Sequence, residues 1–391
     1  MTNIKYCNNI FNYSRYKTAE VHVGDVKIGG NNPIRLQSMT NTNTSDIEKT
    51  INQSIKIFEA GGELVRYSAR GVTEVEKIAE IVKGLRNRKC NIPTVADIHF
   101  NPKAAFLAAQ IVDKVRINPG NFIDKRASFE NLEYSEDEYS DEINKIKDKL
   151  IPLIDLCKKN NIALRIGINH GSLSDRIMSK FGNTPIGMVE SAMEFLRICK
   201  DENFYNIVIS MKSSNTGVMV HSNRMLMNRM IIEKMNFPIH LGVTEAGEGE
   251  DGRIKSAVGI GAMLNDGIGD TIRVSLTEAP ENEIPVAKKI VEYYINREKH
   301  KKINEENIEF NPFEYNKQVN YKINNIGGNN APVVISDLSG DKNMYDKTIL
   351  NPDYIFIDDI EKIRDLQSSK NAIIVNSKQW SNNAEMNNVF P

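Results

Sequence analysis

The chain has 391 residues, of which 40% are hydrophobic and 26% are charged, and its formal net charge is −1. This balance is typical of a globular protein and argues against a disordered chain or a nucleic-acid-binding arm. No apolar run approaches the ~20 residues that a membrane span needs, and the N-terminus lacks the apolar segment of a secretion signal. The four cysteines are far apart and form no C-x-x-C motif, which favours a reducing cytoplasm over a disulfide framework.

Short apolar segments alternate with segments of helical period along most of the chain. Residues 20–28 alternate around Gly24 and Asp25, which predicts a β-hairpin. The strands predicted after it are residues 34–39, 64–68, 94–98, 114–117, 164–168, 207–211, 239–243 and 271–276. The helices predicted with them are residues 46–60, 74–88, 102–111, 141–160, 185–203, 222–235, 255–265 and 282–296. Helix start signals such as Asn101-Pro102 accompany this alternation.

The number of strand–helix units indicates the fold class. Eight units over about 260 residues match an α/β fold of the (β/α)8 TIM-barrel type. The alternative is an open, doubly wound sheet, which usually has fewer units and a single glycine-rich phosphate turn. We therefore assign residues 1–32 to an N-terminal segment with the hairpin and residues 33–296 to the barrel.

Two regions depart from this rhythm. Residues 122–140 form a longer excursion after the fourth strand, and the acidic stretch at 133–142 is interpreted as solvated surface. After residue 297 the chain becomes a charged, linker-like run. Three more strands are then predicted, at residues 333–337, 354–358 and 372–376. Because three strands would leave open sheet edges, we interpret residues 297–391 as the start of an incomplete second α/β domain.

Polar residues follow the predicted strands, and in a barrel these positions share one rim, where active sites of this fold lie. They are Gln37, Ser38, Arg66, Asp97, His99, Arg116, Asn118, Arg165, Asn169, Lys212, Thr244, Glu245, Arg273 and Ser275. Five of them are cationic, and their mutual repulsion in a low-dielectric mouth is unfavourable without an anion. A diphosphate would supply that anion through charge-assisted hydrogen bonds. The turns Gly247-x-Gly249 and Gly267-x-Gly269 are expected to add backbone donors at the same rim.

Structural interpretations remain open for single residues of this set. Any one arginine could pair with a carboxylate of an outer helix or form an ion pair inside the barrel. His99 could be structural or catalytic, whereas His170 and His240 are interpreted as structural. No His, Asp and Glu trio has metal-ligand spacing, and no G-x-S-x-G motif is present, which disfavours a serine hydrolase.

Taken together, the motifs resemble those of the 4-hydroxy-3-methylbut-2-en-1-yl diphosphate synthase family of non-mevalonate isoprenoid biosynthesis. The resemblance covers residues 20–296 and is highly specific, because many motifs occur in order. They are VGDVKIGG (23–30), QSMT (37–40), EAGGELVR (59–66), ADIHF (96–100), RINPGN (116–121), RIGINHGSL (165–173), SMKSS (210–214), HLGVTEAGEG (240–249), IKSAVGIGAML (254–264) and GIGDTIRVSLT (267–277).

The resemblance implies a substrate-binding barrel joined to a domain that holds a [4Fe-4S] cluster through three cysteines and a glutamate. The implied reaction is the reductive ring opening and dehydration of 2-C-methyl-D-erythritol 2,4-cyclodiphosphate, with flavodoxin or ferredoxin as electron donor. Carried over by position, the diphosphate clamp comprises Arg66, Arg116, Arg165, Lys212 and Arg273. Its neutral partners are Asn118, Asn169, Thr244 and Ser275. Asp97 resembles a polar residue at the substrate, and Glu245 resembles the carboxyl group that protonates the leaving hydroxyl.

The cysteines depart from the family pattern. Cys7 lies in the N-terminal tail, Cys90 precedes a strand, and Cys157 and Cys199 fall in predicted outer helices, so none is expected to hold a cluster. We therefore expect the substrate-binding part of a three-domain form that ends inside its middle, inserted domain and is inactive alone. A cytoplasmic homodimer without nucleic-acid or membrane partners is also expected. The rival interpretations are a barrel transferase of the pterin-synthase type and a non-catalytic diphosphate-binding protein.

Overall fold

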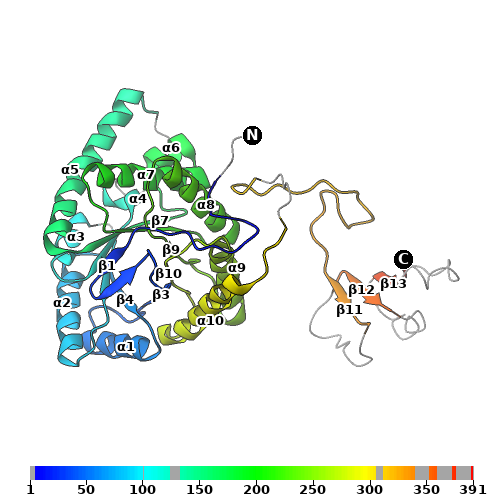
Figure 1. The fold of residues 1–391 in the computed structure, drawn as a ribbon, viewed down its shortest axis with the longest axis horizontal. Coiled ribbons are helices and arrows are strands. Elements are labelled where there is room, and N and C mark those ends of the chain that lie inside the picture. The colour runs from blue at the N-terminus through cyan, green and yellow to red at the C-terminus, as the bar shows by residue number, and fades with distance from the viewer. Residues whose placement is uncertain are drawn as a thin grey trace. The chain divides into compact units, whose positions relative to one another are not determined.

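Eight parallel strands form the sheet at the centre of the first part of the chain (Figure 1). The computed structural model describes residues 5–99, 101–123, 133–304, 311–339, 352–358, 372–375 and 389–390. The chain divides into two units, Met1–Tyr315 and Asn316–Pro391, and each is described by itself. The sequence had suggested a boundary after residue 296.

The sheet is a barrel, as predicted. Its strands are β3 (Arg35–Met39), β4 (Leu64–Ala69), β5 (Thr94–Ile98), β6 (Lys114–Ile117), β7 (Ala163–Asn169), β8 (Ile207–Lys212), β9 (His240–Leu241) and β10 (Thr271–Ile272). They pair in the order β8-β7-β6-β5-β4-β3-β10-β9. A parallel bridge between Ile209 and Ile239 joins the two ends of this order and closes the ring.

Helices surround this ring (Figure 1). They are α1 (Ile47–Glu59), α2 (Val72–Asn87), α3 (Pro102–Ala108), α4 (Pro119–Phe122), α5 (Glu136–Asn160), α6 (Asp175–Phe181), α7 (Pro185–Asp201), α8 (Thr216–Ile232), α9 (Gly249–Asn265) and α10 (Glu283–Ile295). No helix in the described ranges combines the length and the apolar character that crossing a membrane requires.

The predicted hairpin is confirmed as β1 (Val21–Val23) and β2 (Val26–Ile28), which pair antiparallel. Its buried residues Val21, Val23 and Ile28 pack in one apolar cluster with residues of the barrel strands. Those strand residues are Leu64, Val95, Ala163 and Val208. The hairpin therefore plugs the N-terminal end of the barrel and leaves the opposite end for a site.

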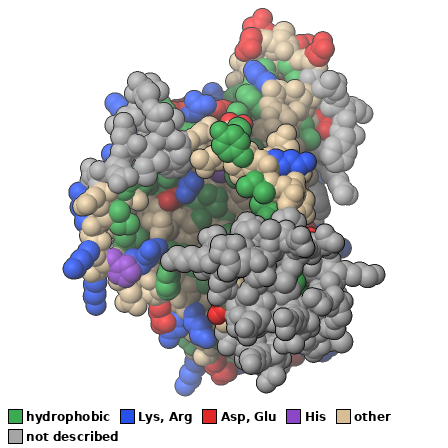
Figure 2. Space-filling view, turned by 90° about the vertical axis from the view of Figure 1, so that its right-hand side faces the viewer, with side chains coloured by type: hydrophobic (Ala, Val, Ile, Leu, Met, Phe, Trp, Pro, Cys, Tyr) green, Lys and Arg blue, Asp and Glu red, His purple; other side chains and the backbone are tan. Residues whose placement is uncertain are grey.

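Several helices begin earlier than the sequence indicated. Helix α5 begins at Glu136 and not at Asp141, because Ser135 and Glu138 form a reciprocal capping box. The acidic stretch is solvated, as expected, but it forms the first turns of a helix, and its side chains gather at the top of the view in Figure 2. Helix α8 likewise begins at Thr216, where the Asn215 side chain accepts a hydrogen bond from the Val218 backbone N–H.

The second unit contains a parallel sheet. Its described strands are β11 (Ile335–Asp337), β12 (Tyr354–Ile357), β13 (Ala372–Val375) and β14 (Val389–Phe390), which pair in chain order. The first three were predicted. The fourth was missed because two residues are too short to show a strand pattern.

Candidate active site

A pocket of about 180 Å³ opens at the C-terminal end of the barrel strands. Its lining residues are Met39, Arg66, Asp97, His99, Arg116, Arg165, Asn169, Lys212, Val243, Thr244, Arg273 and Ser275. They come from all eight strands or the residues directly after them. The pocket therefore brings together nine of the eleven residues that the sequence proposed as a site.

Strand geometry explains why charged residues gather inside. Side chains two positions apart in a strand lie on the same face. On β7, Leu164, Ile166 and Ile168 belong to the apolar core, while Arg165 and Asn169 line the pocket. Toward the pocket, β7 thus sends apolar side chains to the helices and polar ones into the barrel, whereas most barrels of this type fill their interior with branched apolar side chains.

Asp97 is the central carboxylate of the pocket. Its Oδ1 lies 2.7 Å from Nη1 of Arg116, and its Oδ2 lies 3.5 Å from Nε of Arg66 and 3.5 Å from Nε2 of His99. Burial alone would raise the pKa of this carboxyl group, but the charges of Arg116 and Arg66 and the hydrogen bond with His99 outweigh it and hold the pKa well below its usual range. Asp97 is therefore an anion that orients two arginines.

Glu283 is a second carboxylate at the rim, and the sequence analysis missed it. It lies at the start of α10 and accepts hydrogen bonds from Arg273 Nη2 at 3.2 Å, Ser38 Oγ at 2.7 Å and the Leu276 backbone N–H at 3.2 Å. No strand-end pattern points to it. Its signal in the sequence is only an acidic residue in the first turn of the last helix.

Cations nevertheless outnumber carboxylates at this end of the barrel. The cations are Arg66, Arg116, Arg165, Lys212 and Arg273, and the described carboxylates that pair with them are Asp97 and Glu283. Nη1 of Arg165 and Nε of Arg116 are buried, and among the described residues neither has a hydrogen-bond partner. Buried donors of this kind are costly unless a ligand or water accepts their hydrogen bonds.

The pKa values of the basic side chains reflect this excess of positive charge. Burial lowers the pKa of Arg66 to about 10, and the neighbouring Arg273 and Arg116 add to the effect against the attraction of Asp97. Burial, followed by the like charges of Arg165 and Arg66, holds the pKa of Lys212 well below its usual range. An anion in the pocket would counteract the like charges and raise both pKa values.

Two glycines and a methionine shape the pocket. A Cβ on Gly167 would lie 2.5 Å from Nε of Arg116, and a Cβ on Gly242 would lie 2.9 Å from Nζ of Lys212. Glycine at these positions therefore leaves room for the two cations. The thioether sulfur of Met39 accepts contacts from Nε and Nη2 of Arg66 at 3.1 and 2.8 Å.

Two predicted site residues do not line the pocket. Asn118 is buried at the start of α4, where its side chain accepts a hydrogen bond from the Gly120 backbone N–H at 3.2 Å. Glu245 lies in the turn after β9, exposed to solvent, and directly follows the pocket residue Thr244. Its φ is +52°, a left-handed conformation that is unfavourable for a residue with a side chain.

The structure places the predicted histidines and one predicted glycine turn in different parts of the barrel. His99 lines the pocket, whereas His170 contacts the Asn183 carbonyl oxygen at 3.1 Å and His240 is buried inside the barrel. The expectation for Gly267-x-Gly269 is wrong. This turn precedes β10 and therefore lies at the opposite end from the pocket, where a Cβ on Gly267 would lie 2.1 Å from the carbonyl oxygen of Ser14.

The cysteines do not form a metal-binding set. All four are free and buried, and none lines the pocket. Burial raises the pKa of Cys7 to about 11 and that of Cys157 to about 12, whereas metal ligation needs the thiolate. Within the described ranges, no group of three His, Cys, Asp or Glu residues is placed to hold a metal ion. These residues therefore do not fit an iron–sulfur cluster.

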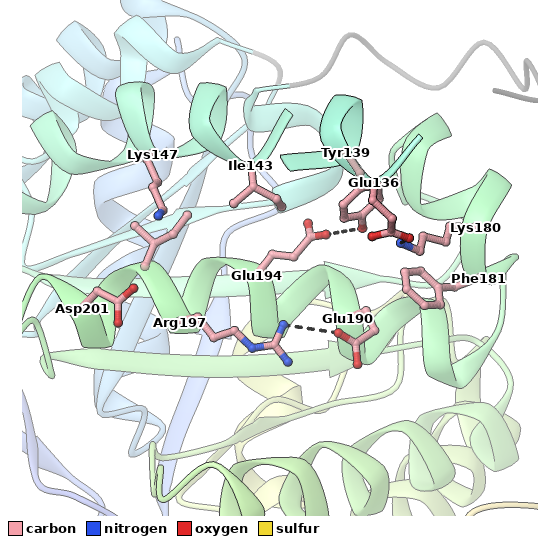
Figure 3. Close-up of a pocket in the computed structure, with 11 residues that line it drawn as sticks. Glu136, Tyr139, Ile143, Lys147, Lys180, Phe181, Glu190, Glu194, Arg197 and Asp201 are labelled. Carbon is pink, nitrogen blue, oxygen red and sulfur yellow. Dashed lines mark hydrogen bonds and ion pairs between the residues drawn. The ribbon is translucent and has the colours of Figure 1, made fainter. Parts of the chain in front are cut away.

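A second pocket, of about 420 Å³, lies between α5, α6 and α7 (Figure 3). Beside it, Glu194 accepts hydrogen bonds from Nη1 and Nη2 of Arg176 at 2.7 and 2.8 Å and from the hydroxyl of Tyr139 at 2.5 Å. The ammonium of Lys180 lies 4.0 Å from the centre of the Tyr139 ring. The carboxylates of this pocket are thus largely engaged by basic residues of the same helices.

Comparison with known proteins gives a consistent result. Residues 18–288 match a family described as the GcpE TIM-barrel domain. The 4-hydroxy-3-methylbut-2-en-1-yl diphosphate synthase (flavodoxin) of Phocaeicola vulgatus is 53% identical over 386 residues, which is 98% of this chain and 62% of that protein. The protein of the same name from Bacteroides thetaiotaomicron is 55% identical over 353 residues, 89% of this chain and 57% of that protein.

A plant protein is also similar. The 4-hydroxy-3-methylbut-2-en-1-yl diphosphate synthase (ferredoxin), chloroplastic, of Oryza sativa subsp. japonica is 51% identical over 286 residues, which is 73% of this chain and 38% of that protein. The matches to these three curated relatives therefore span between 38% and 62% of each relative's own length.

Proposed function

The chain belongs to the GcpE family, and from this premise we propose that its barrel binds 2-C-methyl-D-erythritol 2,4-cyclodiphosphate. The bound substrate undergoes reductive ring opening and dehydration to 4-hydroxy-3-methylbut-2-enyl diphosphate, a step of non-mevalonate isoprenoid biosynthesis. The reaction consumes two electrons and releases water. The printed names of the relatives specify flavodoxin or ferredoxin, and we propose the same class of electron donor here.

The observation that carries the proposal is the excess of buried cations in a pocket open at one end of the barrel. A diphosphate offers several anionic oxygens to donors, such as Nη1 of Arg165, that lack a partner among the residues the structure describes. The proposed clamp is Arg66, Arg116, Arg165, Lys212 and Arg273, with Asn169, Thr244 and Ser275 as neutral donors. Asn118 contributes by holding α4 beside the pocket rather than by lining it.

Proton and electron supply are assigned separately. Asp97 and Glu283 are engaged by arginines, so they orient the clamp. Glu245 is exposed next to the pocket and is the proposed acid for the leaving hydroxyl. The resemblance implies a [4Fe-4S] cluster for electron delivery, but the cysteines of this chain do not fit it, so none of the steps assigned to these residues involves a cluster.

We place the enzyme in the cytoplasm as a homodimer. The four free cysteines suit a reducing compartment. Light scattering of the purified protein measures the number of subunits, and a monomeric mass would contradict the dimer.

Calorimetric titration of the cyclic diphosphate into the 391-residue chain tests the proposed site. We expect binding that weakens with rising salt, and Arg116→Ala and Lys212→Ala should each weaken it by about 1.5–3 kcal/mol, roughly 10- to 150-fold. Lys77→Ala is the matched control, since it removes an exposed cation of α2 that pairs with Glu80. Unchanged affinity in both pocket variants would overturn the proposed site.

A further inference from the structure

A second layer of polar side chains lies inside the barrel, beneath the pocket. Its members are Gln37 of β3, Lys114 of β6, Arg165 of β7 and His240 of β9, and each is at most 1% exposed. Lys114 lies two residues before Arg116 on the same strand, and Gln37 lies two residues before Met39, so both face the interior below pocket residues. The layer is thus buried and adjoins the anion site, because its member Arg165 also lines the pocket.

Lys114 has little to stabilise a positive charge. Its Nζ donates one hydrogen bond, of 3.3 Å, to Oε1 of Gln37, and among the described residues no carboxylate forms an ion pair with it. Nε2 of Gln37, Nε2 of His240 and Nη1 of Arg165 are also buried without partners in the described part of the chain. The layer therefore holds donors that lack acceptors.

The charged neighbours of Lys114 are mostly of its own sign. Arg165 on β7 and Arg66 on β4 oppose its charge, and Asp113, at the start of its own strand, is the carboxylate that favours it. Asp113 is already engaged, because its Oδ2 accepts hydrogen bonds from the backbone N–H and the hydroxyl of Thr94 at 2.7 and 2.9 Å. Burial and then these like charges hold the pKa of the Lys114 ammonium well below its usual range.

We propose that Lys114 is a neutral amine in the empty barrel and gains a proton when a diphosphate fills the pocket above it. The proposal rests on the proposed function only in taking a diphosphate as the anion. The negative charge of the ligand attracts the Lys114 ammonium and opposes the repulsion from the neighbouring arginines. In a low-dielectric interior this attraction favours the charged form of Lys114 over the neutral amine. Binding is then coupled to proton uptake, and Lys114 acts through the field as a positioning residue without touching the ligand.

This coupling makes affinity depend on pH. Where the free barrel lacks the proton and the complex holds it, the dissociation constant rises by up to tenfold for each pH unit. The cyclic diphosphate has no ionisation near neutral pH, because each of its phosphorus atoms carries one ester bond, one anhydride bond and a single, strongly acidic group. Protons taken up on binding must therefore be bound by the protein.

Titration calorimetry at pH 8 in two buffers with different enthalpies of ionisation counts these protons. We expect uptake by the wild-type chain, and about one proton less per ligand bound in Lys114→Met. The two proteins are compared because Lys212 also lines the pocket, and any proton that it takes up is counted in both. Gln37→Glu should show the same loss, since its carboxylate would hold Lys114 charged before the ligand arrives. Equal uptake in the wild type and Lys114→Met would overturn the proposal.

A second measurement needs no ligand. Nitrogen NMR of the lysine side chains distinguishes an amine from an ammonium, and a neutral signal at pH 8 that disappears in Lys114→Met is the expected result. Lys77→Met, on the outer surface of α2, should leave that signal in place. If the signal is present but the cyclic diphosphate does not bind, the proposed function fails while the state of Lys114 stands. If all lysines are charged in the free protein, the proton proposal fails by itself.

Discussion

Three carboxylates lie at or beside the mouth of the barrel, and their surroundings give them different chemistry. Asp97 is buried against Arg116 and Arg66, and Glu283 is buried against Arg273. The arginines hold the pKa of Asp97 well below its usual range, so Asp97 cannot supply a proton near neutral pH, and Glu283 is engaged in its ion pair with Arg273. Glu245 is exposed, and its left-handed backbone conformation stores strain of the kind found at functional sites. It is the carboxylate that we propose as the acid for the leaving hydroxyl.

Glu245→Gln tests this assignment in an active enzyme that contains this barrel. The amide keeps the size and most hydrogen bonds of the side chain but has no proton to release. Turnover should fall by about 10²- to 10⁴-fold, while the affinity for the cyclic diphosphate changes little, because Glu245 does not line the pocket. Glu250→Gln, in the first turn of α9, is the matched control. Near-normal turnover of Glu245→Gln would mean that another group protonates the leaving hydroxyl.

At the residue scale, the sequence predicted those site residues whose positions depend on the geometry of the barrel strands. Arg116, Lys212 and Arg273 lie at or next to the C-terminal ends of their strands, so the barrel pattern alone brought them to one rim. Arg66 and Arg165 lie inside β4 and β7 and reach the pocket from there. Glu283 and Met39 were missed, because their contacts depend on how α10 and the first barrel strand pack around Arg273. Glu245 was placed at the correct end, but its exposure follows from a turn that the strand pattern does not specify.

At the scale of elements, the alternation of side chains along the barrel strands positions the site residues. Strand β7 shows how little space the interior leaves for an added side chain. Gly167 lies between the outward-facing Ile166 and Ile168, and its missing side chain is the space that Arg116 crosses to reach Asp97. The backbone of Gly167 also accepts a hydrogen bond from Nη2 of Arg116 at 2.9 Å. The strand thus provides both the room and an acceptor for the arginine.

Gly167→Ala should therefore displace Arg116. The added methyl would lie 2.5 Å from Nε of Arg116, so the arginine must leave Asp97 or the strand must shift. We expect a loss of stability of about 1–3 kcal/mol from overpacking, together with weaker binding of the cyclic diphosphate by calorimetry. Gly71→Ala is the control, because its methyl would meet nothing closer than 3.4 Å. A variant that binds as tightly as the wild type would show that Arg116 is not held by this strand.

Beside the second pocket, the trio of Arg176, Glu194 and the partly buried Tyr139 joins α6, α7 and the start of α5. Figure 3 shows the contact between Glu194 and Tyr139. Glu194→Gln removes the carboxylate charge that Arg176 contacts through both Nη atoms and should lower the free energy of unfolding by about 3–5 kcal/mol. Glu190→Gln, one turn earlier on α7, should cost at most about 1 kcal/mol, since its arginine partners are largely exposed. Urea unfolding followed by circular dichroism measures both, and equal losses would contradict a special role for the trio.

Helices and strands were predictable where the period of the apolar pattern and the length of the segment indicate the same element, as in α1, α7 and the barrel strands. The residues at which elements begin and end were harder to predict. The starts of α5 and α8 depend on capping by Ser135 and Asn215, whose polar side chains read equally well as loop residues. The strands β9 and β10 are only two residues long, although the apolar runs at 239–243 and 271–276 suggested longer ones. Apolar residues that follow the two strands, such as Val243 and Val274, are buried although they are not part of a strand.

At the scale of the whole molecule, the polar interior makes stability depend on pH in an unusual direction. The pKa values of Lys114 and Lys212 lie well below the usual range in the folded barrel, while an unfolded lysine stays protonated up to about pH 10.4. The unfolded chain therefore binds more protons than the folded one in the intervening range, and stability rises with pH there. His240, whose pKa burial also lowers strongly, adds a rise only below about pH 6.5, where an unfolded histidine titrates.

We therefore expect the free energy of unfolding to increase between pH 7 and 8.5, by up to about 1.4 kcal/mol per pH unit for each lysine that is neutral when folded. The window ends there, because Cys157 and Cys199 have raised pKa values and their thiols ionise above about pH 8.5 in the unfolded chain, which lowers stability. Circular dichroism at 222 nm follows the barrel, since all helices of the described chain belong to the first unit. Lys114→Met should make the rise shallower, and saturating cyclic diphosphate should flatten it by restoring the charge. A wild-type chain whose stability is constant or falls across this window would show that both lysines remain charged in the empty barrel.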